Sequence, residues 1–196
     1  MVRRALVPVA FGVLCLTSAC GGAFFANVPS PSPVTAATVR DALDNSTMQN
    51  AHFRITGTLG IQGNHYPITG DGVLQKSPSF ALSLNMTVQT NTRAGNLVVQ
   101  EIVIGGRVYA RTGSGKWTST PDSSTISPTA PTTYVGEESI GGTMTWHAST
   151  AEKGSTYDIW VRETDGYIVY IQFTDPASAL TMNFDIYNKS PVITAP

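Results

Sequence analysis

Charged residues are scarce in this chain of 196 residues: Asp, Glu, Lys and Arg together make up 13%, about half the quarter usual in soluble proteins. The formal net charge is −1 and no run of Lys or Arg occurs, which argues against nucleic acid as a partner. With three His and two Cys, the sequence does not predict a structural zinc site either. Its length fits one domain of ordinary size.

Motifs that identify common enzyme classes are missing as well. A Gly-x-Ser-x-Gly elbow, a P-loop and a dinucleotide fingerprint are all absent from the sequence. His147 could pair with Glu137 or Glu138 across a hairpin, as an acid–base or metal pair would, but a surface His beside a carboxylate is the commoner arrangement. We therefore predict no catalytic residue, no metal ligand and no cofactor, and a protein that is not an enzyme.

The N-terminal segment has the organisation of an export signal. A short positive region is followed by twelve apolar residues (5–16), too few for a membrane span of about 20 residues. The segment Leu-Thr-Ser-Ala-Cys that ends at Cys20 resembles the lipobox of bacterial lipoproteins, although Thr17 stands where that pattern prefers Leu. The resemblance implies that residues 1–19 are removed as a signal peptide and that Cys20 is diacylated. Ordinary secretory cleavage near Ala19 is the alternative.

The two cysteines agree with a lipid anchor. Cys15 lies inside the apolar stretch and would leave with the signal, so Cys20 is the one cysteine of the mature chain and cannot form an internal disulfide. Residues 20–33 contain an alternating Pro-Ser run, which favours a semi-rigid spacer. Because two acyl chains, such as palmitate, anchor a protein stably, we expect an exported protein held on the extracytoplasmic face of the cell membrane.

Residues 34–196 are predicted to form a single β-rich domain. Apolar residues recur at helical spacing over residues 35–49 and predict a helix there. From Ala51 onward the period changes to two, with turn residues between the apolar runs, which predicts about nine to eleven consecutive antiparallel strands. Residues 118–133 interrupt this pattern with three prolines and predict a long loop.

A sheet of that size needs more cover than one short helix provides, so it should curl. We therefore predict a mainly β (α+β) fold: a curved antiparallel sheet, or half-barrel, with one N-terminal helix and the long loop over its concave face. An apolar hollow in such a sheet is the default site for an apolar ligand, although the inward side chains could instead fill one another as core. Strand alternation gives these inward positions as candidate ligand contacts: Ile55, Leu59, Leu82, Leu84, Met86, Val99, Val108, Ile159, Val161, Val169, Ile171, Leu180, Met182 and Phe184.

Three loose motifs extend the likeness to lipoproteins into the mature chain. They are a Gly-Lys-Trp turn at 115–117, the stretch 135–142 leading to Thr-Trp-His, and residues 157–169. With the lipobox, they make the chain resemble the LppX/LprG type of lipoprotein from mycobacteria, which is similar in fold to the LolA/LolB carriers. The resemblance implies a half-barrel that holds acyl chains and carries lipids toward the outer envelope. Where that family has a helical segment after Lys-Trp, this chain has the Pro/Ser/Thr-rich residues 118–133.

Two functions of different class remain open. The first is a membrane-anchored envelope lipoprotein that binds a hydrophobic ligand, such as a lipid or glycolipid, and carries it across the envelope with a transporter as partner. The second is a non-catalytic module with a filled core that binds a protein or glycan at the envelope. A hydrolase without a recognisable motif is the weakest alternative. An apolar hollow above about 300 Å³ would favour the first function over the second.

Overall fold

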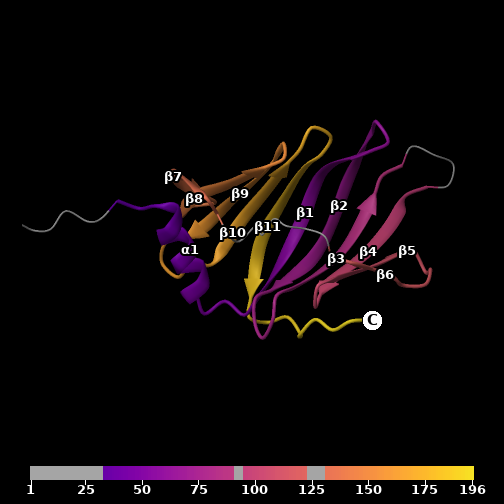
Figure 1. Ribbon diagram of the computed structural model, residues 1–196, viewed down its shortest axis with the longest axis horizontal. Coiled ribbons are helices and arrows are strands. Elements are labelled where there is room, and N and C mark those ends of the chain that lie inside the picture. The colour runs from indigo at the N-terminus through magenta and orange to yellow at the C-terminus, as the bar shows by residue number, and fades with distance from the viewer. Residues whose placement is uncertain (1–32, 91–94, 123–130) are drawn as a thin grey trace, which may run out of the picture. The chain divides into compact units, whose positions relative to one another are not determined.

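One helix and one sheet of eleven antiparallel strands make up the part of the chain that the computed structural model describes, residues 33–90, 95–122 and 131–196 (Figure 1). The predicted signal peptide and Cys20 lie outside these residues. The helix and strands are α1 (Ala36–Asn45), β1 (Asn50–Ile61), β2 (Asn64–Gln75), β3 (Ala81–Val88), β4 (Leu97–Ile104), β5 (Arg107–Thr112), β6 (Thr118–Pro121), β7 (Thr133–Ile140), β8 (Thr143–Glu152), β9 (Ser155–Arg162), β10 (Ile168–Thr174) and β11 (Ala179–Tyr187).

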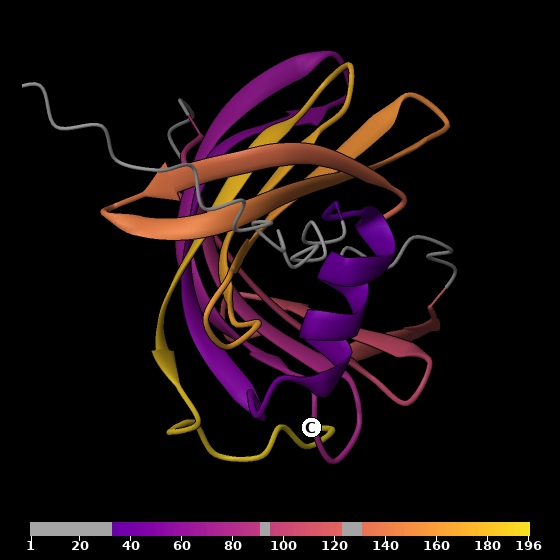
Figure 2. The same cartoon turned by 90° about the vertical axis from the view of Figure 1, so that its left-hand side faces the viewer.

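The strands follow one another in the sheet as they do in the chain, with one exception. Their order is β6-β5-β4-β3-β2-β1-β11-β10-β9-β8-β7, so within the described sheet only β1 and β11 are neighbours distant in sequence. β6 and β7 stand at opposite edges and do not pair with each other, which leaves the sheet open. Figure 2 shows the sheet curved into an arch with α1 in its hollow. The predicted antiparallel meander and open half-barrel are therefore confirmed.

Both ends of α1 are capped, and the helix is shorter than predicted. Thr35 is the N-cap, and its side chain accepts a hydrogen bond from the backbone N–H three residues further on at 3.2 Å. At the other end Lys76 Nζ, from the chain after β2, donates to the backbone oxygens of Leu43 and Asp44, each at 2.7 Å. The Lys76 ammonium group thus satisfies carbonyl oxygens of the last turn, which have no partner within the helix. The helix ends at Asn45, about one turn before the predicted boundary.

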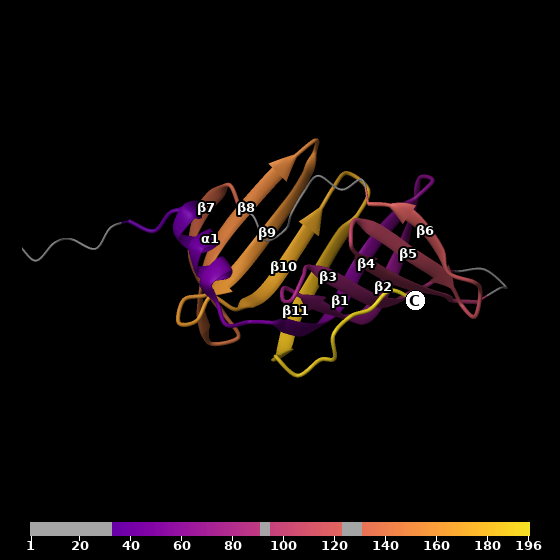
Figure 3. The ribbon, with the colours of Figure 1, turned by 60° about the horizontal axis from the view of Figure 1, so that its bottom comes forward.

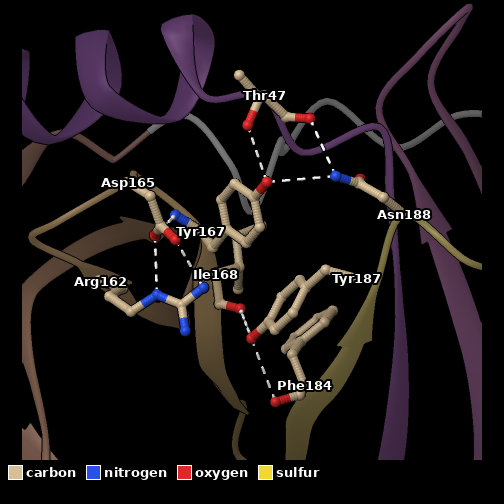
Figure 4. Close-up of polar contacts among 8 residues, drawn as sticks. All are labelled: Thr47, Arg162, Asp165, Tyr167, Ile168, Phe184, Tyr187 and Asn188. Carbon is tan, nitrogen blue, oxygen red and sulfur yellow. Dashed lines mark hydrogen bonds and ion pairs between the residues drawn. The ribbon is translucent and has the colours of Figure 1, made fainter.

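Side-chain hydrogen bonds hold the chain after α1 against the sheet (Figure 4). Thr47 Oγ1 and the Tyr167 hydroxyl oxygen lie 2.8 Å apart, and Asn188 Nδ2 donates to the same hydroxyl at 3.2 Å. Tyr187 donates its hydroxyl proton to the backbone oxygen of Ile168 at 2.8 Å. These bonds tie the segment after the helix to the β9–β10 turn and to the end of β11.

The core lies on the concave face and is built around Phe53 of β1. Phe53 is fully buried, and its ring centroid lies 5.4 Å from that of Phe184 in β11. The ring occupies the space above Gly72 of β2, where an added Cβ would lie 2.4 Å from Phe53 Cζ. Glycine is thus required at residue 72, because any side chain there would collide with the central aromatic residue.

Part of the segment predicted as a long loop is a strand instead. Thr118–Pro121 forms β6, which pairs with β5 and has all four residues exposed. Its proline is the last residue of an edge strand, a position where a missing N–H is tolerated. Residues 123–130 of the predicted loop lie outside the described residues. Beyond them Pro131 is buried, and its carbonyl oxygen accepts a hydrogen bond from Arg40 of α1 at 2.9 Å.

Gly166, in the β9–β10 turn, tests the contact between α1 and the sheet. A Cβ there would lie 2.2 Å from the backbone oxygen of Ala42 in α1, whereas nothing lies within 4 Å of one at Gly142. Both glycines have positive φ, +72° and +83°, so Ala is strained by about 1 kcal/mol at either position. We expect Gly166→Ala to lower the free energy of unfolding by about 3 kcal/mol and Gly142→Ala by about 1 kcal/mol, as measured by urea denaturation. Equal losses would contradict the position of the helix.

Candidate functional site

The concave face is covered by α1 at one end only. The helix packs against β7 and β8, and Figure 3 shows it at that end of the sheet, away from β3, β4 and β5. We name the concave side of β1 to β5 the open half. Among the described residues, no helix lies over this surface.

Apolar side chains form rows across the open half. The register sets Met86 of β3 opposite Val99 of β4. Further along the same strands, Leu82 lies opposite Val103, which in turn lies opposite Val108 of β5. All five side chains are half-buried, and those of Leu82, Met86 and Val99 also pack against the core. On β3 to β5 the open half is therefore an apolar surface that stays in partial contact with water, whereas Phe53 and Ile55 of β1 are buried in the core.

The structure places the residues predicted to face inward in three groups. Those buried in the core are Ile55, Ile159, Val161, Ile171 and Phe184. Those half-buried on the same face are Leu59, Leu82, Leu84, Met86, Val99, Val108, Leu180 and Met182. Val169 differs, because a β-bulge between Ile168 and Tyr170 leaves it without a partner in the register and gives the buried position to Ile168. Contact with a ligand stays a prediction for all of these residues.

A small cavity lies beside the C-terminal end of α1. It has a volume of about 50 Å³, and its lining includes Leu43, Met48, Leu74, Phe80 and Ile168. This volume is far below the roughly 300 Å³ of the smallest usual ligand pockets. The candidate ligand surface is therefore the open half rather than this cavity.

One carboxyl group interrupts the apolar surface of the open half. Glu101 is the one charged residue of β4, and it lies between Leu84 of β3 and Ala110 of β5 on the same face. Burial raises the pKa of the Glu101 carboxyl above its ordinary value, and the negative charge of Asp122 raises it further. Glu101 is not among the residues predicted from alternation, although a lone charge inside an apolar strand is a signal that the sequence contains.

A second carboxylate, Glu163, follows β9 at the end of the sheet that α1 covers. Its Oε1 atom is buried and has no hydrogen-bond partner among the described residues. Burial raises the pKa of Tyr134, and the charges of Glu137 and Glu163 raise it further. This group of side chains lies beside β7, far from β4 in the strand order.

His147 belongs to a cluster on the convex face. Its Nδ1 atom lies 2.9 Å from Glu138 Oε1, and its Nε2 atom lies 3.0 Å from Asp158 Oδ1. Trp160 stacks on the imidazole at 4.1 Å and donates its indole N–H to Glu138 Oε2 at 2.9 Å. Glu137 points to the opposite face, so Glu138 is the partner of His147. The cluster joins β7, β8 and β9 and leaves none of its charged side chains unpaired.

Metal-binding groups and membrane-spanning helices are two further features of interest in the described part of the chain. There, no three His, Cys, Asp or Glu side chains are grouped so that they could hold a metal ion. The helix of that part is neither long nor apolar enough to cross a membrane.

Together these elements define an open antiparallel half-barrel with an apolar concave face that is partly covered.

No protein-family model and no curated protein matches the chain. Among solved structures, it is similar to LprF from Mycobacterium bovis, with 14% identity, a TM-score of 0.42 and coverage of 84% of this chain and 99% of that one. It is also similar to the lipoprotein LppX from Mycobacterium tuberculosis, with 13% identity, a TM-score of 0.47 and coverage of 81% and 99%.

A LolA-superfamily protein from Nitrosomonas europaea matches with 7% identity and a TM-score of 0.34, covering 82% of this chain and 96% of its own. The solved structures similar to this chain thus include the type of lipoprotein that the sequence motifs resemble. At these identities the likeness is one of fold.

Glu138→Gln tests the convex cluster through its dependence on pH. Hydrogen bonds from Trp160 and His147 lower the pKa of Glu138 below its ordinary 4.5. A carboxyl whose pKa is lowered by folding stabilises the folded state above its unfolded pKa, and this contribution is lost as the pH falls through the folded pKa. Because the side chain is 46% exposed, we expect Glu138→Gln to lower the free energy of unfolding at neutral pH by less than about 1 kcal/mol.

The difference from the unchanged protein should shrink as the pH falls below 4.5. Urea denaturation at several pH values measures it, and Glu137→Gln, which removes a carboxylate on the opposite face outside the cluster, is the control. A loss of stability with Glu138→Gln that stays constant into strong acid would contradict the hydrogen-bonded cluster.

Proposed function

We propose that this chain is an envelope lipoprotein whose open half binds the acyl chains of a lipid. The observation that carries this proposal is the row of half-buried apolar side chains on the concave face, which α1 leaves uncovered. Burying a ligand against such a surface contributes about 0.8 kcal/mol for each CH₂ group removed from water. Because these side chains are half-buried and no helix of the described residues covers them, an acyl chain can lie against them without unfolding of the sheet.

The dimensions of the open half suit a long acyl chain. Neighbouring strands lie about 4.8 Å apart, so the five strands β1 to β5 span roughly 20 Å. A chain lying in the hollow of a curved sheet also contacts more surface than one lying on a flat sheet. The apolar contacts on offer from β1 and β3 are Leu59, Leu82, Leu84 and Met86.

We also propose that residues 1–19 are a signal peptide and that Cys20 carries a lipid anchor on the extracytoplasmic face of the membrane. Residues 20–33, with their Pro-Ser run, would then be the tether between the anchor and the domain. Such a tether would hold the domain at the membrane from which a lipid ligand comes. A transporter would be the partner that supplies or receives this lipid.

Binding of a protein is the second candidate function. β6 stands at one edge of the sheet with all its residues exposed, and an unpaired edge can accept a strand from a partner. The small volume of the cavity beside α1 agrees with this alternative, since it indicates that the covered part of the core is filled.

Leu84→Asp tests the lipid site, with Ser83→Asp as the matched control. Leu84 faces the open half, and its neighbour Ser83 in the same strand faces the convex side. A carboxylate beside an acyl chain loses hydration without gaining a partner, so we expect Leu84→Asp to reduce bound lipid at least about tenfold. Ser83→Asp should retain the lipid, because its new charge stays in water.

The measurement is native mass spectrometry of the mature chain carrying Cys20→Ser, purified without detergent from a lipid-rich bacterial host. A near-stoichiometric adduct, released by organic solvent and identified as an acylated lipid, is expected with and without Ser83→Asp. Circular dichroism checks that Leu84→Asp still folds. The same adduct on Leu84→Asp would contradict the proposed site, and bare protein in every sample would favour the protein-binding alternative.

Cys20→Ser in the full chain tests the anchor, with Cys15→Ser as its control. If Cys20 is the lipidated residue, Cys20→Ser abolishes incorporation of a labelled fatty acid in a bacterial host, whereas Cys15→Ser retains it. The label is read by gel fluorescence, and the mass of the mature chain shows where cleavage occurs. Incorporation that survives Cys20→Ser would rule out this anchor.

A further inference from the structure

The concave side is apolar from β3 to β5 and polar at the β6 edge, and Glu101 is the one charged residue within its apolar part. Along one row, Leu84 of β3 is followed by Glu101 and then by Ala110 of β5. Thr118 of β6 ends that row, and Thr120 ends the neighbouring one. The face thus offers apolar contacts on β1 to β5, with the Glu101 carboxyl group among them on β4 and two Thr side chains on β6.

Glu101 is a half-buried carboxylate that lies among apolar neighbours on the concave side. Asp158 and Asp185, both on the convex face, are each held by a His side chain. No hydrogen bond or ion pair to Glu101 occurs among the described residues. When an apolar ligand covers this carboxyl group, the group loses its water, and the free-energy cost is offset if the ligand supplies a hydrogen-bond donor in place of the water.

We propose that Glu101 is the polar contact of the lipid site and selects lipids that carry a hydrogen-bond donor, a hydroxyl or amide N–H group, next to the acyl chain. This inference rests on the proposed lipid binding. The acyl chain lies over β1 to β3, and its donor reaches the Glu101 carboxyl at β4. The Thr120 hydroxyl group then faces the remaining polar atoms of the lipid, whereas the Thr118 hydroxyl donates to the backbone oxygen of Ala110 at 3.1 Å.

Free fatty acids should be excluded by the same group. An ionised fatty acid has no donor for Glu101, and it brings a second negative charge toward Glu101 and Asp122. A site built to bond a hydroxyl rejects an analogue that lacks one, because the polar group of the protein is then left unpaired. The selectivity therefore depends on one carboxyl, whereas binding of the acyl chain depends on the apolar rows.

The experiment compares two photo-reactive probes on the full chain, anchored through its own N-terminus in nanodiscs of zwitterionic lipid. The probes are a long-chain primary alcohol and the matching carboxylic acid, each with a diazirine in the middle of the chain. Cross-linked peptides from residues 50–112 are quantified by mass spectrometry. The two probes can partition into the bilayer to different extents. Because every variant is measured in identical nanodiscs, this difference is the same for all variants and cancels when they are compared.

For the unchanged protein we expect labelling by the alcohol to exceed labelling by the acid about tenfold. Glu101→Gln removes the charge but keeps hydrogen-bonding capacity, so alcohol labelling stays and acid labelling rises until the ratio is close to one. Glu101→Leu removes both properties and lowers alcohol labelling several-fold. Glu163→Gln, a carboxylate at the covered end of the sheet, is the matched control and leaves the ratio unchanged.

Three results would separate the possible failures. An alcohol-to-acid ratio that is the same in the unchanged protein and in Glu101→Gln overturns the role of Glu101 while leaving lipid binding intact. A ratio that changes with Glu163→Gln instead places the polar contact under α1 and also overturns it. Absence of labelling in residues 50–112 by both probes overturns the proposed lipid binding itself.

Discussion

The pairing of β1 with β11 is the interaction on which the rest of this fold depends, because it joins the first strand of the sheet to the last. Without it, β1–β6 and β7–β11 would be two separate meanders, each with an uncovered apolar face. Phe53 of β1 packs against Phe184 of β11 across this junction and fills the space above Gly72. The junction therefore supplies both the backbone hydrogen bonds of a single sheet and the aromatic contact at the centre of the core.

A single helix on so wide a sheet produces the asymmetry from which the proposed function follows. α1 is held at one end by Lys76, which caps its carbonyl groups, and by the hydrogen bonds of Tyr167 to the segment that follows the helix. These contacts place it over β7 and β8, where Gly166 lets the helix backbone come close. Among the described residues no helix covers the concave side of β1 to β5, and its apolar side chains on β3 to β5 are half-buried.

Polar groups on the two faces of the sheet have different surroundings, and this difference distinguishes stability from binding. On the convex face, His147 is bonded to carboxylates on both sides and packs against Trp160, so the cluster is complete without a ligand. On the concave face, Glu101 lies among apolar neighbours with no hydrogen bond among the described residues. A satisfied cluster strengthens the pairing of strands, whereas an unsatisfied carboxyl gains most from a ligand that donates a hydrogen bond.

The sequence by itself determined the fold class and most of the inward-facing residues, because alternation along a strand is a local property of the pleated backbone. It placed Ile55 and Leu84 on the concave face and put Glu137 and Glu138 on opposite faces. Only the tertiary structure decided the bulge that displaces Val169, the strand Thr118–Pro121 and the half of the sheet that α1 covers. For Glu101, alternation from Val99 already gives the concave face, whereas its place between Leu84 and Ala110 was decided by the tertiary structure. These features depend on contacts between residues far apart in the chain, which no local pattern records.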